Sequence, residues 1–181
     1  MNKSNIFPRH TNYELPISAS GEGCYVFDIN GKKYLDGSCG AAVSCLGHSD
    51  STIKDAIIKQ TEKLAFAHTS FFTSEPAEEL ASILSLNSPK GLNRVYFVSS
   101  GSEAVEASLK LAKQYFNEIG KPQKHKVISR RQSYHGNTLG ALAAGGNIWR
   151  RSFFEDLLID TSLISPCYQY RHQSPDESSL D

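Results

Sequence analysis

Apolar residues recur at helical spacing in two segments of the first half of the chain. Ile53, Ile57 and Leu64 share one face of a helix predicted for residues 51–67. Apolar side chains at positions i, i+3, i+4 and i+7 predict a second helix over residues 75–86. Both helices are amphipathic, so each needs another layer of structure to cover its apolar face.

Short runs rich in β-branched and aromatic residues follow these helices. Residues 94–98 and 126–129 are predicted strands, and a long helix runs between them from about Ser99 to Gly120. Strands that alternate with helices predict a parallel α/β sheet. After Gly145 the pattern becomes less regular, and the polar tail is predicted to be linker or surface.

An earlier pair of short strands lies outside this alternation. Asn30-Gly31 separates them and predicts a β-hairpin over residues 24–36, with a type I′ turn because both residues accept positive φ angles. Small residues fill the stretch from Gly37 to Gly47, which suits tight turns more than a regular element.

Composition and charge narrow the class of protein. Of 181 residues, 39% are hydrophobic and 21% charged, and Lys+Arg and Asp+Glu are both 19. This balance predicts no nucleic-acid partner. The four cysteines form no Cys-x-x-Cys pair, and no apolar run approaches the roughly 20 residues of a membrane span. The sequence therefore predicts a cytoplasmic globular protein with no metal site and no membrane association.

For two groups of residues, a structural role is favoured over a functional one. Phe71 and Phe72 are predicted to pack in the core rather than to line a pocket. Solvated arginines, rather than ligands of a substrate carboxylate, are predicted at Arg130, Arg131, Arg150 and Arg151.

The most informative segment begins the long helix. A buried strand leads into Ser100-Gly101-Ser102, and the first turn of a helix offers unpaired N–H groups and a positive dipole end to an anion. Gly101 would let the main chain approach a phosphate, and the two serine hydroxyls would add donors. The same residues fit a capping box of Ser100 with Glu103, so the local pattern leaves both interpretations open. Glu103 and Glu106 must point away from any bound anion.

Four segments together carry a larger pattern. They are Gly21-x-Gly23-x-Tyr25-Val26-x-Asp28-x-x-Gly31-x-x-Tyr34-Leu35-Asp36-Gly37, Leu46-Gly47-His48, Ser100-Gly101-Ser102-Glu103-Ala104-Val105-Glu106 and Tyr134-His135-Gly136-Asn137-Thr138-Leu139-Gly140. In this order they resemble the class III aminotransferases, which depend on pyridoxal 5′-phosphate (PLP). The resemblance implies an α/β fold of the PLP-dependent transferase type (aspartate-aminotransferase type, fold type I). Residues 1–46 would be an N-terminal segment with the hairpin, part of the small domain, and residues 47–181 the first, incomplete part of the PLP-binding large domain.

The resemblance also implies the cofactor-binding residues. The backbone of Gly101 and the backbone and hydroxyl of Ser102 would hold the PLP phosphate, and Tyr134 would stack on the pyridine ring. Ser100 and His135 are predicted to lie behind these contacts, although His135 could instead orient Tyr134 or touch substrate.

The residues that perform chemistry in this family are not found in the sequence. The family needs a lysine that binds the cofactor and an acid beside the ring nitrogen, both well after the Tyr134 segment. Asp176-Glu177, the chain's Asp-Glu pair, lies in a polar tail, and none of the twelve lysines stands where the catalytic lysine would. The chain is therefore predicted to be a fragment with no catalytic residue, inactive by itself.

The complete enzyme is predicted to move an amino group from an amine or amino acid to a 2-oxo acid, as a homodimer. Two alternatives stay open. One is another PLP reaction on the same scaffold, by a decarboxylase or aminomutase, and the other is a non-catalytic truncated remnant.

Overall fold

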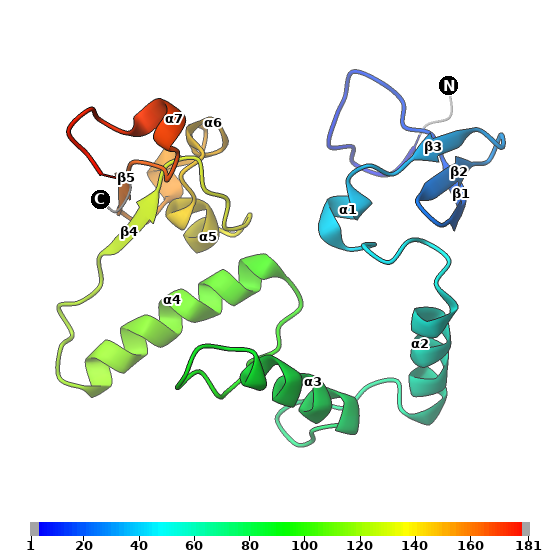
Figure 1. Cartoon of the computed structure of the whole chain (residues 1–181), viewed down its shortest axis with the longest axis horizontal. Coiled ribbons are helices and arrows are strands. Elements are labelled where there is room, and N and C mark those ends of the chain that lie inside the picture. Colours follow the sequence, from blue (N-terminus) through cyan, green and yellow to red (C-terminus); the bar gives the residue numbers. More distant parts are fainter. Residues whose placement is uncertain (1–3, 179–181) are drawn as a thin grey trace. The chain divides into compact units, whose positions relative to one another are not determined.

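The computed structural model describes residues 4–178 and divides into two compact units, with the boundary between Leu80 and Ala81. The elements of the first part (Figure 1) are β1 (Ser18–Glu22), β2 (Tyr25–Asp28), β3 (Lys33–Leu35), α1 (Cys39–Ala42), α2 (Ser51–Lys63) and α3 (Glu75–Leu86). Those that follow are α4 (Gly101–Glu118), β4 (Val127–Arg130), α5 (Leu139–Ala144), α6 (Ile148–Arg151), η1 (Glu155–Leu157), β5 (Thr161–Ile164) and α7 (Gln169–His172). The domain boundary expected between residues 46 and 47 stays a prediction.

The first unit contains a three-stranded antiparallel sheet in the order β1-β2-β3. The hairpin of β2 and β3 confirms the predicted strands, but the type I′ turn is wrong because Gly31 has a positive φ (78°) and Asn30 does not. Gly31 N–H donates to the Asp28 carbonyl, and Asp28 N–H donates to the Lys32 carbonyl. This pattern is typical of a longer hairpin loop with a glycine in the left-handed region. Strand β1 was not predicted, because its sequence is polar. Its extended backbone is held by its pairing with β2.

A buried carboxylate organises that loop. Asp28 Oδ1 accepts hydrogen bonds from the backbone of Asn30 and Lys32, and Oδ2 accepts one from the Tyr34 hydroxyl. Burial raises the pKa of Asp28, but these bonds outweigh it and hold the pKa below the ordinary aspartate value. The carboxylate therefore replaces the ladder hydrogen bonds that a tighter turn would have made.

The helices confirm the periodic pattern of the sequence. Helix α3 has the predicted bounds, α4 lies within the predicted range, and α2 ends at Lys63 rather than near residue 67. The side chain of Asp50 accepts a hydrogen bond from Ile53 N–H and caps α2. None of the described residues of these three helices is buried. Their apolar faces are therefore open in this chain.

The strand predicted at residues 94–98 is wrong, because residues 92–98 form no regular element. A strand exists only when a neighbour accepts and donates its backbone hydrogen bonds, and no described strand pairs with this segment. The predicted core packing of Phe71 and Phe72 is also wrong: their exposed fractions are 78% and 67%.

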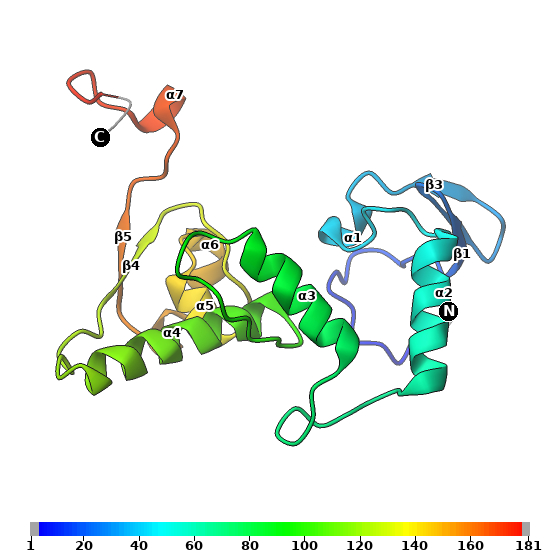
Figure 2. The same cartoon turned by 60° about the horizontal axis from the view of Figure 1, so that its bottom comes forward.

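The second unit is built on two parallel strands. Strand β4 pairs with β5 in parallel, with Val127 opposite Thr161 and Arg130 opposite Ile164. Helix α5 contacts α4, α6 and β4, and Figures 1 and 2 both show it beside the N-terminal end of α4. The buried apolar residues in the described part of the chain all lie in α5, at Ala141, Ala143 and Ala144. Within residues 4–178, no helix is both long and apolar enough to cross a lipid bilayer.

Candidate functional site

The first turn of α4 forms a satisfied cap that leaves two donors free. Ser100 Oγ accepts a hydrogen bond from Glu103 N–H at 3.2 Å, and Glu103 Oε2 accepts one from Ser99 N–H at 2.7 Å. Among the described residues, nothing accepts from the N–H groups of Gly101 and Ser102. The capping box and the anion site are therefore compatible, because Glu103 turns its carboxylate back to the preceding loop.

Gly101 has open space where a side chain would stand. A Cβ built on Gly101 meets no atom within 4 Å, and its φ lies outside the left-handed region. Neither the packing nor the backbone of this chain therefore requires glycine here. The free N–H groups therefore face open space, as donors to an anion must.

The segment that follows β4 docks directly on this turn. Ser102 Oγ accepts a hydrogen bond from Asn137 N–H at 2.9 Å. Gly136 is buried with a φ of 137°, and a Cβ there would lie 2.5 Å from Ser102 Oγ. Because the Ser102 oxygen accepts from Asn137, the hydroxyl proton stays available for a second partner.

Glu106 joins the two segments a second time. Its Oε1 accepts hydrogen bonds from Gly140 N–H at 2.8 Å and from Ala141 N–H at 3.2 Å, which caps the start of α5. Thr138, the N-cap residue of α5, makes no cap hydrogen bond of its own. The carboxylate of Glu106 therefore points away from the first turn of α4, as an anion site there requires.

The surroundings of Glu106 favour its charged form. The Thr138 hydroxyl lowers the pKa of Glu106 most; burial opposes this, and the N–H groups of Ala141 and Gly140 lower the pKa further. Thr138 Oγ1 itself lacks a hydrogen bond of regular geometry, so the two backbone donors are the firmer contacts. The pKa of Glu106 lies below the ordinary glutamate value as a result.

We expect Glu106→Gln to destabilise the second unit by roughly 0.5–1 kcal/mol at pH 7, a modest loss because the carboxylate is partly solvated. A native pKa below the unfolded value means that the contribution is full above the unfolded value of about 4.3 and disappears as the pH falls through the native value. Urea unfolding followed by the fluorescence of Trp149, the single tryptophan, measures the effect. Glu118→Gln, at the exposed end of α4, is the control, and equal losses for the two variants would refute the capping role.

Tyr134 and His135 are both exposed. The guanidinium carbon of Arg150 lies 5.1 Å from the centre of the Tyr134 ring, whose side chain is otherwise open to solvent at 63% exposure. His135 makes no hydrogen bond or ring contact with any described residue, and its role beside Tyr134 stays a prediction. Ser100 stands behind Gly101 and Ser102 as the helix cap.

Arg151 corrects the prediction of four solvated arginines. It is 5% exposed, and its Nη1 donates to the carbonyls of Ala143 and Gly145 and to Thr161 Oγ1. The burial of Arg151 was not predictable from composition, because an arginine at the end of a four-residue helix gives no sign of it. Its spacing of four from Glu155, to which it also donates, was the available signal.

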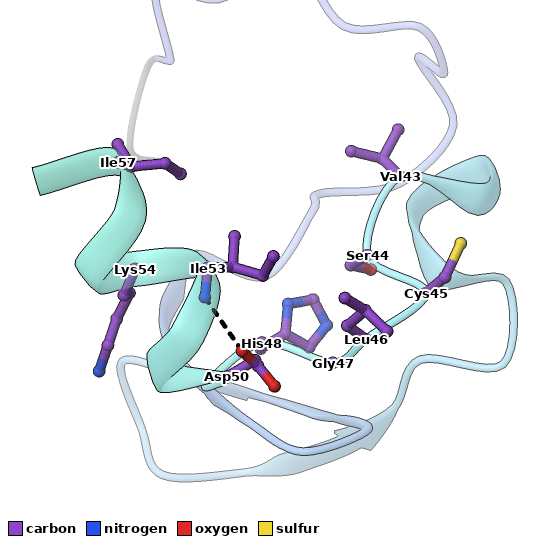
Figure 3. A pocket seen from close by; sticks show the side chains of 10 residues that line it. All are labelled: Val43, Ser44, Cys45, Leu46, Gly47, His48, Asp50, Ile53, Lys54 and Ile57. Atoms are coloured by element: carbon purple, nitrogen blue, oxygen red, sulfur yellow. Dashed lines mark hydrogen bonds between the residues drawn. The ribbon is translucent and has the colours of Figure 1, made fainter. Parts of the chain in front are cut away.

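A separate hollow of about 240 Å³ lies within the first unit. Figure 3 shows its lining residues, which are Val43, Ser44, Cys45, Leu46, Gly47, His48, Asp50, Ile53, Lys54 and Ile57. Beside it, His48 Nε2 lies 2.9 Å from Asp36 Oδ2. Burial raises the pKa of Asp36, but the bond to His48 and further hydrogen bonds from residues 38–44 hold it below the ordinary value. Four successive residues before the hollow, Cys39–Ala42, have positive φ angles, so α1 is a single irregular turn and not a regular helix.

Among residues 4–178, no group of three or more His, Cys, Asp or Glu side chains is placed to hold a metal ion. In the second unit, the start of α4 offers backbone donors and a hydroxyl, and the exposed ring of Tyr134 comes two residues before Gly136, which packs against Ser102. Such a donor set suits a phosphate attached to a flat ring.

Known proteins are similar to this chain over most of its length. The family model for class-III aminotransferases matches residues 7–179. An uncharacterized aminotransferase of Schizosaccharomyces pombe is 40% identical over 98% of this chain and 39% of its own length. A Bacillus subtilis protein, also named as an uncharacterized aminotransferase, is 44% identical over 86% of this chain and 35% of its own length.

Solved structures show the same relationship. The adenosylmethionine-8-amino-7-oxononanoate aminotransferase of Methanocaldococcus jannaschii matches 91% of this chain with a TM-score of 0.85 and 33% identity. The omega transaminase of Pseudomonas jessenii in complex with PMP matches 95% with a TM-score of 0.85 and 30% identity. The chain covers 39% and 40% of these two structures, so it spans well under half the length of the proteins it matches.

Proposed function

This chain belongs to the class-III aminotransferases, and from that premise we propose that the start of α4 holds the phosphate of PLP. Its fold is part of the PLP-dependent transferase fold, fold type I, and the family uses PLP. The observation that carries the proposal is the pair of free N–H groups at Gly101 and Ser102 beside open space. Both nearby carboxylates, of Glu103 and Glu106, are engaged elsewhere.

The residues of the chain divide the work of binding. The N–H groups of Gly101 and Ser102 would donate to phosphate oxygens, and the Ser102 hydroxyl would add its own proton while accepting from Asn137. Tyr134 would cover the ring and exclude water from one face, since its side chain is exposed and flat. Ser100 fixes the turn through its bond to Glu103 N–H.

The complete protein would transfer an amino group from an amine or amino acid to a 2-oxo acid. When bound, PLP supplies an electron sink for this chemistry. We infer that the catalytic lysine and the acid beside the ring nitrogen do not come from these 181 residues, so the chain alone binds without catalysing. We also propose that the complete protein is a homodimer, as the family resemblance implies, and that it is cytoplasmic.

Binding of pyridoxamine 5′-phosphate (PMP) to the chain tests the proposal without any covalent step. We expect PMP to bind at least about tenfold more tightly than pyridoxamine, which lacks the phosphate, since backbone and hydroxyl donors to a charged oxygen are strong. Titration followed by PMP fluorescence anisotropy measures both ligands. Equal affinities would overturn the proposed cradle. Borohydride reduction with PLP should label no single lysine stoichiometrically.

Gly101→Ala should separate binding from stability. The new methyl group fills the open space and should weaken PMP binding at least about tenfold, while the midpoint of urea unfolding stays constant or rises, because alanine restricts the unfolded chain. Gly37→Ala is the matched control, since its Cβ also meets nothing and its φ also lies outside the left-handed region. Equal PMP affinity for Gly101→Ala and the unaltered chain would contradict the assignment.

A further inference from the structure

Arg150 lies over two aromatic rings of the second unit. Its guanidinium carbon is 4.5 Å from the centre of the Trp149 ring and 5.1 Å from that of Tyr134. Both distances are within the range of a cation–π interaction, and a planar guanidinium also stacks on aromatic faces. The contact between Arg150 and Tyr134 joins helix α6 to the segment that docks on the start of α4.

The contact with Arg150 is the interaction that holds the Tyr134 side chain. Among the described residues, Tyr134 makes no hydrogen bond and no contact with another ring, and it stays 63% exposed. Its backbone, by contrast, is close to fixed structure, because Gly136 packs against Ser102 two residues later. Without Arg150, the ring would be free to turn about its side-chain bonds while its backbone stayed in place.

The helix that carries Arg150 is held in place by the neighbouring residue. The next residue, Arg151, is 5% exposed and donates to the carbonyls of Ala143 and Gly145, which hold α6 against the end of α5. Arg150 therefore connects a buried anchor to an exposed ring. An aromatic ring that is held from one side and open elsewhere is suited to receive a second flat ring.

We propose that Arg150 is a positioning residue for the cofactor ring and acts through Tyr134. The inference rests on the proposed function, since it takes the pyridine ring of PLP as the flat ring that Tyr134 receives. Arg150 sets the plane of Tyr134 before binding, so less side-chain freedom is lost when the ring stacks. The competing interpretation is that Arg150 binds the cofactor's phosphate directly by its charge.

The contact is tested first without cofactor. Protons on the Arg150 side chain that lie over aromatic rings should resonate upfield in the NMR spectrum of the chain. Tyr134→Leu and Trp149→Leu should each remove part of that shift. An Arg150 side chain with ordinary chemical shifts in the unaltered chain would overturn the inference at this step.

A double-mutant cycle with PMP then separates the two interpretations. Arg150→Met should weaken PMP binding by about threefold to fivefold, the value of an exposed cation–π contact. In the Tyr134→Leu background, the same substitution should weaken PMP binding no further. An undiminished loss in that background would mean that Arg150 acts on the ligand directly, and would overturn the inference.

Two further variants and one spectrum complete the test. Arg150→Lys keeps the charge but loses the planar group, and its PMP affinity should lie between those of the unaltered chain and Arg150→Met. Arg171→Met, an exposed arginine on α7, controls for net charge and should leave PMP binding unchanged. The induced circular dichroism per bound PMP should fall in Arg150→Met, because a less fixed ring orients the ligand less. An unchanged signal would refute positioning, whereas absence of PMP binding by the unaltered chain would overturn the proposed function and this inference with it.

Discussion

Gly136→Ala should weaken PMP binding at least about tenfold and destabilise the second unit by roughly 1–3 kcal/mol. The φ of 137° is strained for any residue with a side chain, and the added Cβ would lie 2.5 Å from Ser102 Oγ and 2.8 Å from its Cα. The segment must therefore lift away from the start of α4. The hydrogen bond from Asn137 N–H to Ser102 and the placement of Tyr134 would be lost together.

The control for Gly136→Ala is a second glycine in the left-handed region. Gly120 has a φ of 72°, and a Cβ there meets nothing within 4 Å. Gly120→Ala should therefore carry the backbone strain of about 1 kcal/mol without any effect on PMP binding. Trp149 fluorescence during urea unfolding reports stability, and PMP anisotropy reports binding. If both variants lowered PMP affinity equally, the docking of residues 134–137 on Ser102 would not be what the site depends on.

Arg151→Met should cause the largest loss of stability, about 3 kcal/mol, because it removes one partner from a buried network. Methionine fills a similar length but leaves the Gly145 carbonyl without its donor, while the Ala143 carbonyl retains the Thr161 hydroxyl. The last turn of α5 and the start of α6 would loosen, since Ala143 lies in that turn and Gly145 follows it directly. Urea unfolding followed by Trp149 fluorescence measures the change directly, because Trp149 precedes Arg151 on α6.

Two comparisons define the result for Arg151. Arg131→Met removes an exposed arginine of the same unit and should change stability by no more than about 0.5 kcal/mol. Arg151→Lys keeps the charge but offers a point donor instead of a planar fork. Its loss of stability should lie between those of Arg131→Met and Arg151→Met. A loss below about 1 kcal/mol for Arg151→Met would show that the buried side chain is replaceable by any apolar group of its length.

Sequence periodicity predicted the long helices α2, α3 and α4, but not the short helices α1, α5, α6 and α7. The apolar stripe over residues 75–86 and the capping residues of α4 act within one or two turns, so the sequence of the segment carries the information that forms it. The cap around Gly101 was likewise recognisable, although the local pattern left capping and anion binding both open. The family and its fold followed from four such local segments taken in order, and the comparisons confirm them.

Pairing between distant segments was not predictable in the same way. Residues 94–98 have the composition of a strand and form none, whereas residues 161–164 form β5 beside β4 without a recognisable pattern. A strand depends on a neighbour that may be far along the chain, and composition does not specify that neighbour.

The sequence by itself determined helices α2, α3 and α4, the hairpin of β2 and β3, and the family, and it predicted the residues that would hold the cofactor. Only the tertiary structure decided what holds those residues in place: Glu106 of α4 caps α5, Gly136 packs against Ser102, Arg151 of α6 donates to the carbonyls of Ala143 and Gly145, and Arg150 lies over Tyr134. The reason is physical. Helix periodicity and caps act between residues three or four apart, whereas these contacts join groups whose approach depends on the path of the whole unit.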